Sequence, residues 1–332
     1  MILHPPVVAL LAGSVLVGLV LLHASRFAVQ ILRRWDLASG SELQLALERK
    51  TYLITTVLFW AFLFQLGSLF LFVYVADDLS KLFVGAMCAA GSLALNRWGY
   101  AALLVKVFNF LLAGVWLVVN HADNRSPAYP LVRPKYLLLL LLTPSMLAEA
   151  ALQGLYFLSL KPNVITSCCG SLFSEGGRGL PALLSSFPRP AMEASFGVAM
   201  LLTFALGGWF LARGSRAAGS LFSLSGAATL AVSVAAFLSY QCLYFYELPT
   251  HHCPFCVFQA GYWYVGYPLY LSLLAGAVPA LGVGALLPYQ RASGLADVLP
   301  VFLRKLAAAS LLSYGVFAAI VFCRAAVSDL RF

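Results

Sequence analysis

The sequence predicts an all-α protein, a polytopic integral membrane helix bundle of about eight transmembrane helices with both termini exoplasmic. Hydrophobic residues make up 62% of the 332 residues, charged residues only 10%, and the mean hydropathy is +0.90. Soluble domains carry about a quarter charged residues, so a soluble core could not bury this much apolar surface. The net charge of +9 is spread over short segments between apolar runs. A nucleic-acid partner would need a dense basic patch, so membrane lipid is the expected surrounding.

The predicted spans are apolar runs of about 20 residues, long enough to cross a hydrocarbon core of about 30 Å. They lie near residues 6–24, 52–75, 100–119, 136–159, 191–212, 220–240, 262–285 and 306–323. No basic segment precedes the first run, so we expect a retained helix and not a cleaved signal peptide. The runs suggest an N-terminal three-helix region, a four-helix module and a C-terminal helix, with bounds 1–130, 131–290 and 291–332.

Lysine and arginine placement predicts the orientation, because short basic loops stay on the cytoplasmic side. The segments after the odd-numbered spans hold thirteen basic residues, against seven after the even-numbered spans and in the C-terminal tail. Both termini are therefore expected outside, which in a bacterial inner membrane is the periplasmic side. On this topology all seven cysteines fall at the exoplasmic side, namely Cys88, Cys168, Cys169, Cys242, Cys253, Cys256 and Cys323. Disulfide chemistry persists on that side of the membrane.

The segment His251-His252-Cys253-Pro254-Phe255-Cys256 directly precedes the seventh predicted span. A C-x-x-C at a helix N-terminus is typical of a redox pair, because the positive helix end stabilises a thiolate. A purely structural disulfide explains the pair poorly, since so short a loop constrains the unfolded chain little. The alternative is a soft-metal site, in which Cys253, Cys256 and the histidines His251 and His252 bind Cu(I) or Zn.

A second cluster, Cys168 and Cys169, lies in a loop of roughly thirty residues, which is long for a chain built of tight turns. Adjacent Cα atoms are about 3.8 Å apart, below the usual disulfide range of about 4.4 to 6.8 Å. A vicinal bridge would therefore be strained and easily reduced. Either it is a reactive switch, or each sulfur pairs elsewhere.

The stretch from Leu243 to Gln259, LYFYELPTHHCPFCVFQ, resembles the region around the active C-x-x-C of the DsbB-type disulfide-bond formation proteins. Those proteins and the related vitamin K epoxide reductases are four-helix bundles that pass electrons from thiols through two cysteine pairs to a bound quinone. Predicted spans four to seven follow the vitamin K epoxide reductase order. The resemblance differs at Ala260, where the bacterial family has an arginine, and in the adjacency of Cys168 and Cys169.

The resemblance implies a role for each cysteine pair. Cys253 and Cys256 would be the catalytic pair that faces the quinone, and Cys168 and Cys169 the catalytic shuttle pair that meets the partner protein. Gln259 would contact the cofactor. Glu149, near the middle of predicted span four, is costly in hydrocarbon, so it should face the bundle interior, where Lys106 could pair with it. Glu149 is then either a proton path or quinone contact, or a paired structural charge.

The expected function is that of a membrane thiol–disulfide oxidoreductase, which passes electrons between an extracytoplasmic redox partner and a membrane quinone. The partner would be a thioredoxin-like protein or a cytochrome. One alternative is a non-enzymatic membrane protein that binds or delivers Cu(I) or Zn for metalloprotein or cytochrome maturation. Another is an anchor subunit of an electron-transfer complex.

Overall fold

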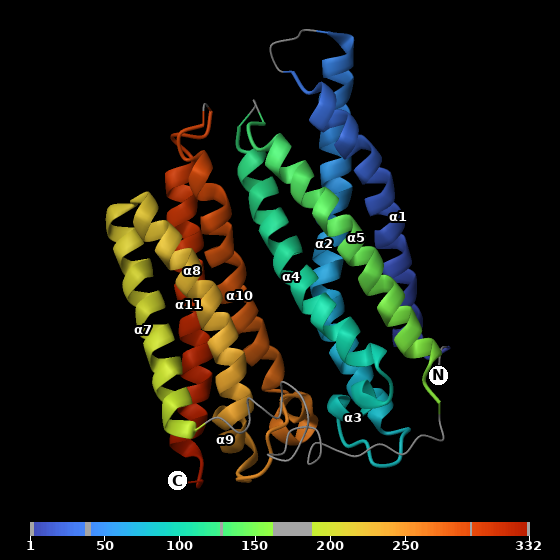
Figure 1. Ribbon diagram of the computed structural model, residues 1–332, viewed down its shortest axis with the longest axis vertical. Coiled ribbons are helices and arrows are strands. Elements are labelled where there is room, and N and C mark those ends of the chain that lie inside the picture. Colours follow the sequence, from blue (N-terminus) through green and yellow to red (C-terminus); the bar gives the residue numbers. More distant parts are fainter. Residues whose placement is uncertain (1–2, 37–40, 127–128, 162–187, 293, 331–332) are drawn as a thin grey trace. The chain divides into compact units, whose positions relative to one another are not determined.

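The protein is an all-α polytopic membrane protein. The computed structural model describes residues 3–36, 41–126, 129–161, 188–292 and 294–330, and no strand occurs in these ranges (Figure 1). Within the described ranges, eight helices are long and apolar enough to cross a membrane, which confirms the predicted number. The helices at the span positions are α1 (Pro5–Arg34), α2 (Glu42–Ser80), α4 (Trp98–Asp123), α5 (Val132–Leu158), α7 (Arg189–Arg213), α8 (Arg216–Ala236), α10 (Gly266–Leu286) and α11 (Leu299–Val327).

The chain divides into two compact units. Unit 1 comprises Met1–Phe72, Asn96–Leu160 and Pro288–Leu303, and unit 2 comprises Val73–Leu95, Lys161–Leu287 and Arg304–Phe332. Helix α2 passes from unit 1 into unit 2, and its last two turns belong to unit 2 with the short helix α3 (Ala89–Ala94). The units group the helices differently from the three consecutive segments expected from the sequence, because α5 joins the N-terminal helices.

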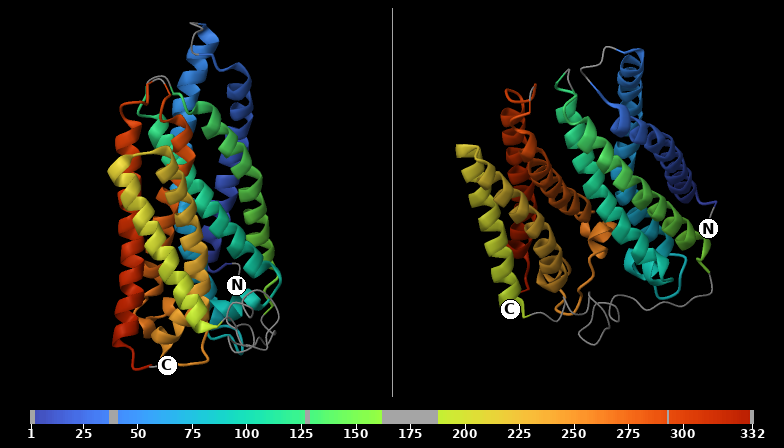
Figure 2. Two further views of the ribbon diagram at one scale, coloured as in Figure 1. Left: turned by 60° about the vertical axis from the view of Figure 1, so that its left-hand side comes forward. Right: turned by 45° about the horizontal axis from the view of Figure 1, so that its top comes forward.

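In unit 1, α5 packs against α1 and α4, and the views in Figures 1 and 2 show these helices side by side. The core is mostly aliphatic, and within it the rings of Phe62 and Trp116 meet edge to face with centroids 4.8 Å apart. A buried ion pair joins the turn between α4 and α5, with Lys135 Nζ 2.5 Å from Asp123 Oδ2. Asp123 also accepts the backbone N–H of Leu131 at 2.8 Å. The ion pair thus ties the end of α4 to the start of α5.

In unit 2, α8 packs against α7 and α10, and α11 lies in the same group of helices (Figure 2). Tyr314 of α11 inserts between two glycines: its hydroxyl donates to the Gly226 carbonyl at 2.7 Å, and a Cβ at Gly276 would lie 2.8 Å from its ring.

Gly214 ends α7 in the left-handed region at φ 64°, and Ser215 caps α8 by accepting the N–H of Ala218. Glycine tolerates that conformation without the Cβ clash of other residues.

The sixth span runs further than the apolar run predicts. After α8 it continues through a π-helical turn (Phe237–Gln241) and α9 (Cys242–Tyr246). Glu247, in the left-handed conformation at φ 54°, ends it. The predicted sixth span, which ends near residue 240, leaves Cys242 in the loop that follows it, and this expectation is wrong: the residue is buried within the helix, and its sulfur is 3.9 Å from the Leu238 carbonyl.

Candidate functional site

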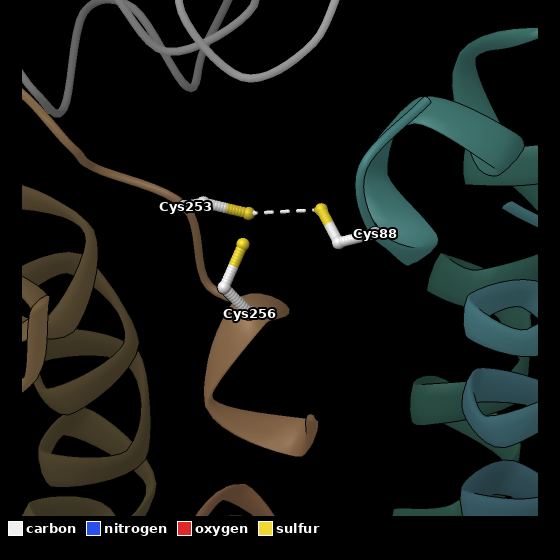
Figure 3. A group of neighbouring side chains, drawn as sticks. All are labelled: Cys88, Cys253 and Cys256. Atoms are coloured by element: carbon white, nitrogen blue, oxygen red, sulfur yellow. Dashed lines mark hydrogen bonds between the residues drawn. The ribbon is translucent and has the colours of Figure 1, made fainter. Parts of the chain in front are cut away.

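Three cysteines gather at one place in unit 2, although they are far apart in the sequence. Cys88 lies between α2 and α3, Cys253 lies in the segment after α9, and Cys256 begins a 3₁₀ turn (Cys256–Phe258). Figure 3 shows their side chains pointing toward one another. The Sγ atoms of Cys88 and Cys253 are 3.5 Å apart, and all three sulfurs lie within 4.8 Å of one another. The exposed fractions are 0%, 0% and 6%, so this three-thiol cluster is shielded from bulk solvent.

The C-x-x-C forms a tight turn and does not begin a helix. The backbone N–H of Phe255 points at Cys253 Sγ, with N to Sγ 3.4 Å, and the N–H of Phe258 donates to the Phe255 carbonyl at 2.9 Å. Helix α10 begins only at Gly266. The positive helix end that the sequence predicts beside Cys253 is therefore absent there, and backbone N–H groups of the turn take its place.

Extended and left-handed residues delay the start of α10. Gln259 is extended at φ −85° and ψ 158°, and it is followed by a second 3₁₀ turn (Ala260–Tyr262). Trp263 and Tyr264 then adopt φ values of 56° and 53°. Non-glycine residues rarely occupy this region, so the local contacts of the segment outweigh its intrinsic preference.

An Asp77–Gln259 clamp holds the loop that carries Cys88. The side-chain amide of Gln259 donates to the Met87 carbonyl at 2.7 Å and to Asp77 Oδ1 at 3.0 Å. Asp77 Oδ1, near the end of α2, also accepts the backbone N–H of Ala89 at 3.1 Å. Hydrogen bonds thus fix the residues on both sides of Cys88 to the segment that follows the C-x-x-C. Gln259 is expected from the resemblance to contact a cofactor, but both hydrogen bonds of its side-chain amide belong to this clamp.

The two adjacent histidines have different environments. His251 Nε2 lies 3.4 Å from Cys256 Sγ, whereas His252 Nδ1 lies 3.0 Å from the Leu238 carbonyl. Burial lowers the pKa of His251 below the usual value, the neighbouring His252 lowers it further, and Cys88 opposes the shift. At neutral pH His251 is therefore an uncharged imidazole beside a thiol, and it can accept or donate a proton there.

Two tyrosines hold the backbone of the C-x-x-C. The Tyr246 hydroxyl donates to the Cys253 carbonyl, and the Tyr270 hydroxyl donates to the Pro254 carbonyl at 3.1 Å. The Tyr246 ring also meets the His251 ring edge to face, with centroids 4.5 Å apart. Because buried carbonyls that keep partners are costly to move, the turn is anchored independently of its sulfurs.

Glu149 lies in unit 1, and the expected pairing with Lys106 is confirmed. Its Oε1 is 2.5 Å from Lys106 Nζ, its Oε2 accepts from the Asn109 amide at 2.7 Å, and both oxygens lie 2.6 Å from the Gln65 amide nitrogen. All of these side chains are buried. The geometry matches the paired structural charge, one of the two readings of Glu149.

Cys168 and Cys169 lie outside the described residues, so their predicted role as a shuttle pair stays a prediction. Sequence reasoning did not include Cys88 in the site. The sequence signal for it was the predicted topology, which places every cysteine on one side of the membrane, and that prediction does not say which sulfurs meet. Nothing in the sequence marks Asp77 as part of the site, because an acidic residue near the end of a span is usually solvated.

The arrangement supports two kinds of chemistry, because three sulfurs this close can exchange disulfides or share a metal ion. Comparison of the chain with protein-family models, with curated proteins and with solved structures finds no match.

Proposed function

We propose that the protein is a membrane thiol–disulfide oxidoreductase that passes electrons between an extracytoplasmic thiol partner and a membrane quinone. The observation that carries the proposal is the 3.5 Å approach of the Cys88 and Cys253 sulfurs, with Cys256 in the same cluster. Exchange requires one sulfur to reach a sulfur of a disulfide. Here an attacking thiol and a C-x-x-C pair lie in contact before any reaction.

The exchange step balances within the cluster. In the oxidised state Cys253 and Cys256 share a disulfide. The thiolate of Cys88 attacks Cys253 Sγ, a Cys88–Cys253 bond forms, the Cys253–Cys256 bond breaks, and Cys256 leaves as a thiolate. One disulfide is lost and one is gained, so the step moves no net electrons. In the half-reaction with the partner, two thiols of a thioredoxin-like protein are oxidised to a disulfide and the cluster disulfide is reduced to two thiols; reduction of the quinone to a quinol then restores the cluster disulfide.

Neighbouring groups assist both sulfurs. The Phe255 N–H stabilises Cys253 as a thiolate once the cluster disulfide has been reduced. His251 is neutral and 3.4 Å from Cys256, so it exchanges a proton with that thiol as the disulfide opens or closes. The Asp77–Gln259 clamp keeps Cys88 within reach.

We place the electron acceptor, a planar aromatic quinone, in a pocket of about 490 Å³ beside the C-x-x-C segment. Its walls include Tyr246, Tyr262, Trp263 and Arg324. Tyr246 links this pocket to the cluster through its hydrogen bond to the Cys253 carbonyl. Arg324 faces Glu247 at 3.0 Å, at the edge where a carbonyl oxygen could be bound. A quinone held there would supply an acceptor for two electrons and two protons.

Partner trapping tests the proposal. In the double variant Cys88→Ser, Cys256→Ser both neighbouring thiols that could resolve the bond are gone, so Cys253 should retain a mixed disulfide with its extracytoplasmic partner, visible as a reducible adduct by mass spectrometry. Cys323→Ser, which removes an exposed cysteine outside the cluster, should trap nothing. A second variant, with Cys168 and Cys169 replaced by serine, should lose the adduct if these two residues form the shuttle pair. Absence of any adduct in the double variant Cys88→Ser, Cys256→Ser, in cells where that variant is stable, contradicts the proposal.

A further inference from the structure

We propose that the reduced three-thiol cluster, together with His251, is a binding site for one thiophilic divalent cation with a filled d shell, of which Zn(II) is the type. The proposal does not rest on the redox function, because it requires only that the three cysteines be thiols. It also differs from the metal site suggested by the sequence: Cys88 becomes a ligand, and of the two histidines only His251 is one.

The spacing of the sulfurs is that of a metal–thiolate site. Zinc bonds to sulfur at about 2.3 Å, so two ligands of a tetrahedron lie about 3.8 Å apart. The sulfurs of Cys88 and Cys253 are 3.5 Å apart, and no pair in the cluster exceeds 4.8 Å. A disulfide would need a separation of about 2.0 Å. Small side-chain adjustments therefore place all three sulfurs around one ion.

The position of His251 favours it as the fourth ligand. A zinc-bound nitrogen at about 2.0 Å lies about 3.5 Å from a zinc-bound sulfur, and His251 Nε2 is 3.4 Å from Cys256 Sγ. The imidazole is outside the group whose ligand atoms are all mutually within 4.8 Å, so binding requires it to turn toward the other two sulfurs. His252 is directed to the Leu238 carbonyl instead.

Charge and surroundings favour a divalent ion over Cu(I). Three thiolates around Zn(II) leave one net negative charge and around Cu(I) leave two, and a buried site penalises the larger charge. The Phe255 N–H directed at Cys253 Sγ offsets part of that charge. The clamp and the tyrosine contacts with the Cys253 and Pro254 carbonyls hold the ligand-bearing segments, as groups around a bound metal commonly do.

Metal binding by the purified full-length chain tests the site. Protein in detergent is reduced without oxygen, loaded with Zn(II), freed of excess metal, and its zinc measured by mass spectrometry. The wild type should hold one equivalent. Cys88→Ser and His251→Ala should bind at least about tenfold more weakly, while their matched controls Cys323→Ser and His252→Ala should bind as the wild type does. Zinc should also protect Cys88, Cys253 and Cys256 from alkylation, a readout in the wild type that needs no variant to fold.

Three results would overturn the inference. The first is less than a tenth of an equivalent of zinc with no protection from alkylation. The second is equal zinc binding by Cys88→Ser and the wild type, and the third is equal loss in His251→Ala and His252→Ala. A parallel loading with Cu(I) that gives stoichiometric binding where Zn(II) gives none would overturn the choice of a divalent ion. Zinc binding without a trapped partner would leave this site standing and remove the redox proposal, and the reverse result would remove only the site.

Discussion

The buried polar group around Glu149 in unit 1 and the three-thiol cluster of unit 2 differ in how their polar atoms are bonded. Around Glu149, an ammonium and two amides saturate both carboxylate oxygens, and the opposite charges of Glu149 and Lys106 cancel. In the thiol cluster, the strong hydrogen bonds go to the backbone around the cysteines, and the sulfurs face one another. Thiols are weak donors and acceptors. The first arrangement is therefore suited to fixing helices, and the second leaves its atoms available for chemistry.

The largest expected effect comes from breaking the ion pair in unit 1. Replacing Glu149 with leucine leaves the Lys106 ammonium buried without its counter-charge, which costs about 3 to 5 kcal/mol of unfolding free energy. The double variant with Lys106→Leu should recover much of that loss. Unfolding in detergent measures both.

The half-exposed pair of Arg189 and Glu193 is the matched control. Because solvent screens that pair, Glu193→Ala should cost less than about 1 kcal/mol. If Glu149→Leu is no more destabilising than Glu193→Ala, the Glu149 group is not the structural charge pair described here.

A smaller effect is expected from loosening the clamp in unit 2. Gln259→Ala removes two hydrogen bonds worth about 1 kcal/mol each, so the equilibrium constant that governs the population with Cys88 in contact should fall roughly thirtyfold. The rate of Cys88–Cys253 cross-linking by a mild oxidant reports that population.

Gln153→Ala provides the comparison, since that buried glutamine also donates two hydrogen bonds, to the Leu10 carbonyl and Ser14, within unit 1. It should cross-link at the wild-type rate. Equal rates in Gln259→Ala and the wild type would show that the clamp does not position Cys88.

The smallest expected effect is a pH dependence from His251. Its lowered pKa keeps the imidazole neutral at pH 7, so its help to Cys256 is present at neutral pH and is lost as pH falls through that lowered pKa, below about 6.5. Alkylation of reduced Cys256 should be about threefold slower in His251→Ala than in the wild type at pH 7, the size of one weak hydrogen bond. The difference should vanish near pH 5. His252→Ala should show no such dependence, and a difference that persists unchanged at pH 5 would rule out the imidazole as the proton acceptor.

Most of the fold could be predicted because crossing a bilayer demands long apolar runs. The bounds of the helices could not be predicted in the same way. An apolar run ends at the charged residues Arg49 and Lys50, whereas helix α2 continues through both and begins at Glu42. The delayed start of α10 also escaped prediction. The stretch after Cys256 is mostly apolar and aromatic, like the start of a span, but Gln259 is held extended while its side chain bonds to residues more than 170 positions earlier.

Two of the three cysteines in the site could be predicted from the sequence. Cys253 and Cys256 are recognisable from their spacing alone, which is a local property. Cys88 stands 165 positions from Cys253, and a single sequence carries no record of such a contact. The pairing of Glu149 with Lys106 was accessible, because two opposite charges in neighbouring spans have few other ways to be satisfied.

Disulfide mapping determines whether Cys88, Cys253 and Cys256 act as one cluster. In a chain with Cys168, Cys169 and Cys256 replaced by serine, mild oxidation should join Cys88 to Cys253, because their sulfurs are 3.5 Å apart. Peptide mass spectrometry should find that bond in most molecules, with Cys242 and Cys323 still alkylatable after unfolding. Cys88 and Cys253 remaining as separate thiols under the same oxidation, in protein that elutes as a folded species, would contradict the account.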